Sequence, residues 1–245
     1  MKTFVAIAVA AALLAGDGEA IASGLLGPPE PEAREDHLSI GAGYERDAMK
    51  WKPGDGGFGD VSVSRNQAYL QLLDTGISFA ELGAAFLRVG AADFDDGADF
   101  QAGYRPFGAV GMKDVWYGNR RGRFKVGTIF LASYYPGYEA EKTLASGTTV
   151  KAKIKNEWDV ALGIALQASF GGKVSLYAGP LFVYGRAKVT REGAGLGDAT
   201  TYEEKSPAGG FGGIALNLSR TLVILAEAQY RNDVSAGASI AWSFE

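Results

Sequence analysis

The segment from residue 150 to residue 170 alternates between two kinds of side chain. Even positions are apolar, apart from Asn156, while odd positions are polar, charged or small. Successive side chains of a β-strand point to opposite faces, so the pattern predicts one strand with an apolar and a polar face. A tilted strand needs about 9–11 residues to cross a bilayer, and this segment is longer. Length and alternation together predict a strand of a transmembrane β-barrel.

The same alternation recurs along the chain and predicts an all-β fold, an antiparallel up-and-down transmembrane β-barrel of about ten strands. The expected strands lie at about residues 38–45, 60–74, 82–92, 99–116, 124–134, 150–170, 174–184, 214–218, 222–231 and 234–244. The second and the fourth have the weakest patterns, so a barrel of eight strands is the alternative.

Connection lengths differ between the two ends of the predicted barrel. The turns that follow the even-numbered strands are short, and the long connections all follow odd-numbered strands. The long ones are expected as loops at residues 47–58, 137–149 and 190–205. Outer-membrane barrels have short periplasmic turns and longer external loops, so both ends of the barrel domain are expected in the periplasm.

The first residues resemble a signal for export. Lys2 precedes an apolar run over residues 4–14, and the small-x-small motif Ala20-Ile21-Ala22 follows it. The run is too short for a transmembrane helix, so the layout predicts a cleaved signal peptide. The next segment carries three prolines and several acids, which is typical of an extended linker. The expected division of the chain is a signal peptide at residues 1–22, a linker at 23–36 and a barrel at 37–245.

Composition narrows the class of protein further. The chain has no cysteine, which excludes disulfides and cysteine metal sites, and its 35 glycines among 245 residues suit barrel strands and tight turns. The formal net charge of −4 gives no sign of nucleic-acid binding.

The last residues, 238–245, resemble the terminal strand of small bacterial outer-membrane β-barrel proteins of the OmpA-like and porin-like type. In that family an alternating apolar strand ends in an aromatic residue, whereas here Phe244 is followed by Glu245. Residues 81–94 also look like small outer-membrane barrels. The resemblance implies a location in the outer membrane of a Gram-negative bacterium. It also implies recognition of the last strand by the barrel-assembly machinery and contact with outer-membrane lipids and lipopolysaccharide.

Residues with catalytic or metal-binding chemistry are sparse. Omptin proteases and lipid A deacylases, which are barrel enzymes of similar size, need a catalytic histidine, and the sole histidine here is His37, expected at the periplasmic rim. The acidic group Asp93, Asp95, Asp96 and Asp99 is interpreted as a solvated turn, and the glycine-rich residues 56–60 as a flexible loop. We therefore expect no catalytic residue, cofactor or metal.

Charged residues at inward positions are the most informative candidates for function. A barrel of ten strands has a narrow interior, so such charges can form a salt-bridged plug or line a small water-filled conduit. The expected lumen residues are Arg88, Arg105, Lys113, Lys125, Lys151, Lys153, Lys155, Glu157, Asp159, Glu227 and Arg231.

The sequence thus predicts a non-enzymatic outer-membrane barrel that is structural or weakly pore-forming. Three alternatives stay open: a module whose long loops bind a surface partner, a lipid-modifying enzyme, and a soluble exported barrel.

Overall fold

The structure is a computed structural model that describes residues 25–30, 38–54, 59–75, 83–96, 101–119, 123–143, 149–192 and 199–244. The expected signal peptide and His37 lie outside these residues. Over the described ranges, no helix is long and apolar enough to cross a membrane.

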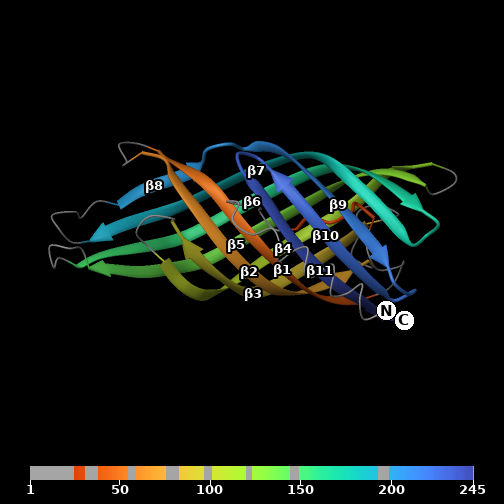
Figure 1. Ribbon diagram of the computed structural model, residues 1–245, viewed down its shortest axis with the longest axis horizontal. Coiled ribbons are helices and arrows are strands. Elements are labelled where there is room, and N and C mark those ends of the chain that lie inside the picture. The colour runs from red at the N-terminus through yellow and green to blue at the C-terminus, as the bar shows by residue number, and fades with distance from the viewer. Residues whose placement is uncertain are drawn as a thin grey trace.

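The described residues form eleven β-strands of one antiparallel sheet (Figure 1). The strands are β1 (Leu38–Pro53), β2 (Val61–Asp74), β3 (Gly83–Asp95), β4 (Gln101–Gly118), β5 (Phe124–Thr143), β6 (Thr149–Phe170), β7 (Val174–Glu192), β8 (Ala199–Glu204), β9 (Ala208–Asn217), β10 (Leu222–Tyr230) and β11 (Val234–Phe244).

Ten of these strands close into a ring. Each pairs with its neighbours along the chain, β9 follows β7, and β11 pairs with β1 from Leu38↔Phe244 to Arg46↔Ala236. The ring leaves no free edge over this part of the sheet, which is the usual way for an antiparallel barrel to satisfy its backbone groups. The predicted all-β barrel of ten antiparallel strands is confirmed.

The short strand β8 was not predicted, because it lies in the expected loop 190–205. It pairs with β7 on one side, through Thr190↔Ala199, and with β1 on the other, through Pro53↔Tyr202. The hairpin of β10 and β11 is short, 9 and 11 residues against 22 in β6, so β8 takes its place between β7 and β1 at the far end.

The other two expected loops are also largely strand, which corrects the prediction. β1 continues to Pro53 within the expected loop 47–58. β5 and β6 remain paired up to Thr143↔Thr149, which removes most of the expected loop 137–149. The strands therefore project well beyond the part of the wall that the apolar alternation marks, as the long arrows of β5, β6 and β7 show in Figure 1.

A belt of exposed apolar side chains surrounds the ten-stranded part of the wall. In β5 it runs from Phe124 to Tyr134, and Leu70 and Leu162 are 59% and 43% exposed on its surface. Aromatic side chains mark its two margins, as in barrels that cross a bilayer. The margin toward β8 carries Tyr44, Tyr134, Trp158, Tyr184 and Tyr230, and the opposite margin carries Trp116, Tyr117, Phe124, Phe170, Trp242 and Phe244.

Beyond the β8-side margin, the polarity of the wall is reversed. We call this part, formed by β1 to β8, the extension. Its inward side chains are apolar and buried, and the rings of Trp51, Phe94 and Tyr138 contact one another, with centroids 5.9 Å apart for Trp51–Phe94 and 5.5 Å for Phe94–Tyr138. Its outward side chains, such as Lys52 and Glu139, are polar and exposed.

The reversal in β6 takes place at Asn156. Asn156 has a φ of +52°, and the register between β6 and β7 shifts between Lys155 and Trp158. The extra residue of such a bulge exchanges the two faces of the strand. Leu162 therefore faces outward, whereas Ile154, also at an even position, is 4% exposed inside the extension.

Candidate functional site: the occupied lumen

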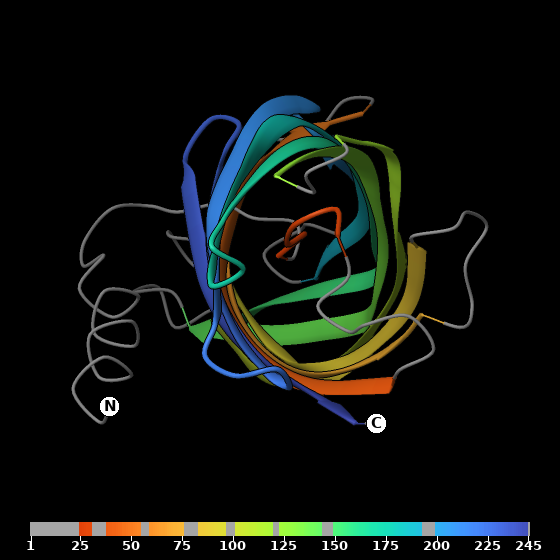
Figure 2. The same ribbon diagram turned by 90° about the vertical axis from the view of Figure 1, so that its right-hand side faces the viewer.

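Residues 25–30, expected as part of a linker, lie inside the barrel, as the red segment within the ring in Figure 2 shows. We call this segment the plug. Leu25 and Leu26 are 2% and 0% exposed. Inward glycines of the wall leave room for them: a Cβ added at Gly163 would lie 2.8 Å from Leu26 Cδ1, and one at Gly237 would lie 2.8 Å from Leu25 Cδ2. The wall and the plug therefore fit each other closely.

Glu227 of β10 anchors the middle of the plug. Its Oε1 accepts a hydrogen bond from the Leu26 amide at 2.9 Å, and its Oε2 accepts one from the Gly27 amide at 2.7 Å. The hydroxyl of Tyr177 and the side-chain amide of Gln229 donate to the same carboxylate, at 3.0 and 2.8 Å. An ionised carboxylate that accepts several hydrogen bonds makes stronger bonds than a neutral acceptor does.

Charged groups hold both ends of the plug. At its start, the Leu25 amide donates to Glu45 Oε2 at 2.6 Å, and Arg88 Nη2 donates to the Leu25 carbonyl oxygen at 2.5 Å. At its end, the Glu30 carboxylate pairs with Lys125 and accepts a hydrogen bond of 2.8 Å from Gln167. Carboxylates and basic groups of the wall thus hold the plug at both of its ends.

A second layer lies between the plug and the extension. Arg65 of β2, whose side chain is 0% exposed, pairs with Glu157 at 2.8 Å and with Asp47 at 3.4 Å. Its guanidinium lies 4.0 Å from the centre of the Tyr135 ring, and Gln67 donates to Asp47 at 3.2 Å. These contacts crosslink four strands across the lumen, and we call this set of residues the Arg65 layer.

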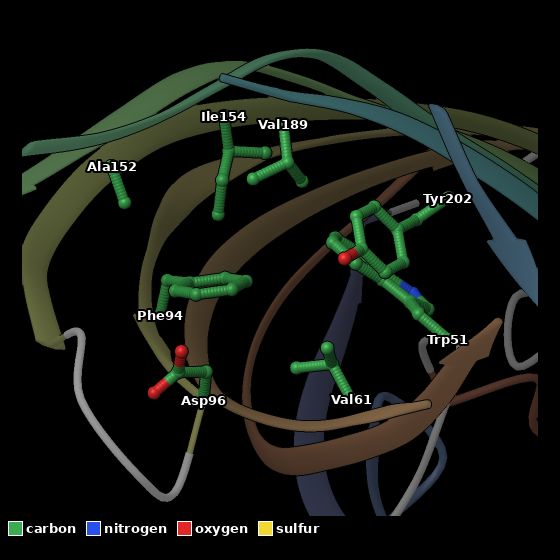
Figure 3. A pocket seen from close by; sticks show the side chains of 8 residues that line it. All are labelled: Trp51, Val61, Phe94, Asp96, Ala152, Ile154, Val189 and Tyr202. Atoms are coloured by element: carbon green, nitrogen blue, oxygen red, sulfur yellow. The ribbon is translucent and has the colours of Figure 1, made fainter. Parts of the chain in front are cut away.

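The third layer is the apolar interior of the extension, which contains a cavity (Figure 3). The cavity measures about 320 Å³, including the space at its open mouth. The Trp51 ring lies between two others of the lining, with its centroid 6.3 Å from that of Tyr202 and 5.9 Å from that of Phe94. It is lined by Trp51, Val61, Phe94, Asp96, Ala152, Ile154, Val189 and Tyr202. Only Asp96 among these carries a charge, so the cavity suits an apolar occupant.

The structure gathers most of the charges expected in the lumen. Those buried inside the wall are Arg88, Lys113, Glu157, Asp159, Glu227 and Arg231. Lys125 is 14% exposed and pairs with the plug. Arg105, in contrast, is exposed, at a level where β4 no longer pairs with β5.

The positions of three lysines differ from the prediction: Lys151, Lys153 and Lys155. The alternation placed them in the lumen, and the structure places them on the outer face of the extension, because the bulge at Asn156 turns this half of β6 over. There, Lys151 pairs with Glu141 at 2.5 Å and Lys153 with Glu192 at 3.1 Å.

Three charged lumen residues lie outside the predicted set: Glu45, Asp47 and Arg65. Arg65 lies in a part of β2 whose outward neighbours, Ser64 and Asn66, are polar, so no alternation marks it. Continuing the inward positions of β1 and β2 by steps of two beyond the belt would have found all three.

The acidic group expected as a turn is only partly described, because Asp99 lies outside the described residues. Asp93 accepts hydrogen bonds from the Asn66 backbone amide, at 2.5 Å, and from the Asn66 side chain, at 2.8 Å. Asp95 accepts one from Gln101 at 2.9 Å. These bonds fasten β3 to its neighbours. The glycine-rich segment 56–60 is described only at its last two residues.

Comparison with known proteins identifies the fold. No protein-family model matches the chain. No curated protein matches it either. Among solved structures, the translocator domain of the autotransporter NalP from Neisseria meningitidis is 10% identical, with a TM-score of 0.50 over 87% of this chain and 90% of that chain.

Two further structures have lower TM-scores. The transport unit of the autotransporter AIDA-I from Escherichia coli is 12% identical, with a TM-score of 0.46 over 87% of this chain and 92% of that one. An outer-membrane channel from Pseudomonas putida F1 is 9% identical, with a TM-score of 0.46 over 91% and 100%. At these identities the likeness concerns the fold, and the chain has the fold of bacterial outer-membrane β-barrels.

Proposed function

We propose that the protein is a structural barrel of the bacterial outer membrane that its own plug keeps closed, so that it conducts no ions at rest. The observation that carries this proposal is the Glu227 carboxylate, which binds two consecutive amides of the plug in the centre of the lumen. A freely conducting pore needs a continuous aqueous path, whereas here the plug, the Arg65 layer and the apolar interior of the extension follow one another.

The placement in a membrane is supported by the belt and its aromatic margins. The belt section of β5 matches the length of about 9–11 residues with which a tilted strand crosses a bilayer. We propose that the chain is exported, inserted by the barrel-assembly machinery through β11, and not catalytic. Glu157→Gln and Glu227→Gln variants should then leave the outer-membrane lipid profile unchanged by mass spectrometry, and altered lipid A species would contradict this.

The proposed closure has a direct test, because the chain lacks cysteine and a single introduced thiol reports one position. Leu26→Cys should stay unlabelled by a charged, membrane-impermeant thiol reagent in the folded barrel and label fully after unfolding. The matched control Ser62→Cys, exposed on the outside of β2, should label in both states. Equal labelling rates at the two positions would contradict an occupied lumen.

Conductance in planar bilayers gives the second readout. The folded wild-type protein should show no discrete conductance steps.

Replacing the anchor of the plug should change both readouts. In the labelling experiment, Leu26→Cys combined with Glu227→Gln should expose the thiol, because a neutral amide cannot accept hydrogen bonds with both of its polar atoms. If the wild type showed steady conductance steps, and Glu227→Gln showed steps of the same size, the plug would not be the element that closes the barrel.

A second candidate function is the binding of a small apolar molecule, which the cavity of the extension favours. Its lining is apolar and aromatic apart from Asp96, as is usual for sites that bind small apolar molecules. An apolar fluorescent probe such as N-phenylnaphthylamine should bind the wild type, and Ala152→Phe should abolish binding by filling the cavity. The control Lys153→Phe adds the same ring on the outer face. Equal loss in both variants would contradict binding in the cavity.

A further inference from the structure

The three lysines on the outer face of β6 have different partners. Lys151 and Lys153, the two that lie farther from the belt, pair with the carboxylates of Glu141 and Glu192. Lys155, the nearest to the belt, stands directly opposite Lys188 of β7. Both ammonium groups are exposed, and neither forms an ion pair with any residue that the structure describes. Like charges in direct register across a sheet repel each other, so this pair lacks a counter-ion.

A third cation lies one step closer to the belt. Arg186 of β7 is exposed on the same outer face, opposite Trp158 of β6. On its other side it stands opposite Glu203 of β8, but within the described part of the chain the two form no ion pair. The site formed by Lys155, Lys188 and Arg186 therefore carries three positive charges. Two carboxylates lie beside it: Glu203 of β8, and Glu139 of β5, which stands opposite Lys153.

The height of this site on the wall indicates its ligand. Trp158 and Tyr184, whose ring centroids lie 5.6 Å apart, mark the margin of the belt directly below it. Aromatic margins lie at the headgroup level of a bilayer, and the belt beneath them faces acyl chains. An anion held here is thus level with lipid phosphates. Guanidinium and ammonium groups are the usual protein ligands of phosphate.

We propose that Lys155, Lys188 and Arg186 bind the phosphate group of a phosphorylated glycolipid in the outer leaflet. The lipid supplies the counter-ion that the protein itself supplies to Lys151 and Lys153. This site rests on the proposed placement in the outer membrane, but it does not depend on whether the lumen is closed.

Native mass spectrometry of the full barrel in detergent tests the site, with bisphosphorylated lipid A as probe and dephosphorylated lipid A as its control. The wild type should retain the phosphorylated lipid and not the dephosphorylated one. Lys155→Gln with Lys188→Gln should weaken binding by about tenfold or more, the effect of losing charge-assisted hydrogen bonds. The matched pair Lys151→Gln with Lys153→Gln should stay within about twofold, because those lysines already have partners.

The midpoint of unfolding distinguishes a specific phosphate site from a general attraction between the positive charges of the protein and the lipid. In detergent without lipid, Lys155→Gln should leave the midpoint of unfolding unchanged or raise it, because it relieves repulsion. In vesicles that contain lipid A, the same substitution should lower the midpoint. Inorganic phosphate should not displace the lipid, since it lacks the acyl chains; displacement would show a site for free anions instead.

Three results would overturn the proposal: unchanged lipid retention in the Lys155→Gln and Lys188→Gln double variant, an equal loss in the Lys151 and Lys153 control, or retention of the dephosphorylated lipid. A failure of the membrane placement itself is distinguishable, because the wild-type protein would then be extracted by salt without detergent and would show no heat-dependent shift in gel mobility.

Discussion

The belt and the extension are built from the same continuous strands, yet they have opposite polarity. In the belt, apolar side chains such as Leu162 face outward, and charged groups such as Glu227 lie inside. In the extension, Lys153 faces outward, and Trp51 and Ile154 are buried inside. The belt is thus arranged like a membrane barrel and the extension like a soluble one. The difference teaches that the solvent around each part of the wall, and not the sheet itself, decides which face is apolar.

Two strands achieve this reversal in different ways. β1 keeps one register throughout, and its inward residues change in type from Glu45 and Asp47 to Met49 and Trp51. β6 keeps its apolar residues at even positions and turns its faces over at Asn156. A change of residue type and a bulge therefore produce the same result.

Removing the charge at the junction between the two regions should have the largest effect. Arg65→Ala leaves Asp47 and Glu157 buried without their cation, so it should lower the free energy of unfolding by about 3–5 kcal/mol. Urea titration in detergent, followed by gel mobility, measures this change. Arg46→Ala, on the exposed face of β1, is the control, expected within about 0.5 kcal/mol. Equal effects would mean that the Arg65 layer does not hold the two regions together.

Adjacent residues of β6 test the orientation of the extension. Ile154→Ala should cost about 2–5 kcal/mol, because it leaves a space in the apolar interior. Lys153→Ala should cost about 1 kcal/mol or less, since it removes only an exposed ion pair. The same urea titration measures both variants. If uninterrupted alternation were correct, Ile154 would lie on the outer surface, and its truncation would have the smaller effect.

A charge added to the outer surface should destabilise the protein more in the belt than in the extension. Leu162→Lys places an ammonium group against acyl chains and should cost about 2–4 kcal/mol in lipid vesicles. Ser62→Lys, on the outside of the extension and opposite Lys50, should cost about 1 kcal/mol or less, the size of a cross-strand charge repulsion in water. Refolding equilibria in vesicles check both, and similar costs at the two positions would show that the extension also lies in lipid.

The bulge itself should give the smallest effect. A φ of +52° is accessible to asparagine and glycine but strained for other residues, so Asn156→Ala should cost about 1–2 kcal/mol. Asn156→Gly should keep stability within about 0.5 kcal/mol, because glycine adopts this conformation without strain. Thermal gel-shift midpoints report both. Alanine tolerated as well as glycine would mean that the bulge is not confined to this residue.

The belt could be predicted from the sequence because its alternation is local and uniform, so the number of strands and the inward positions of Arg88 and Glu227 followed. The extension was missed because its outward residues are charged, which makes strand segments such as residues 137–143 resemble loops. The plug has no local signal: residues 25–30 resemble a linker, and their anchor, Glu227, lies some 200 residues away along the chain.

The most direct test of the central claim, the reversal of polarity at Asn156, is spin labelling along β6. Single cysteines at positions 150–166 would be measured for access to oxygen, which concentrates in lipid, and to a water-soluble nickel complex. Labels at positions 160, 162 and 164 should be open to oxygen, those at 151, 153 and 155 to nickel, and those at 152 and 154 to neither. Oxygen access at 152 and 154, in phase with 162, would show one uninterrupted strand and contradict the account.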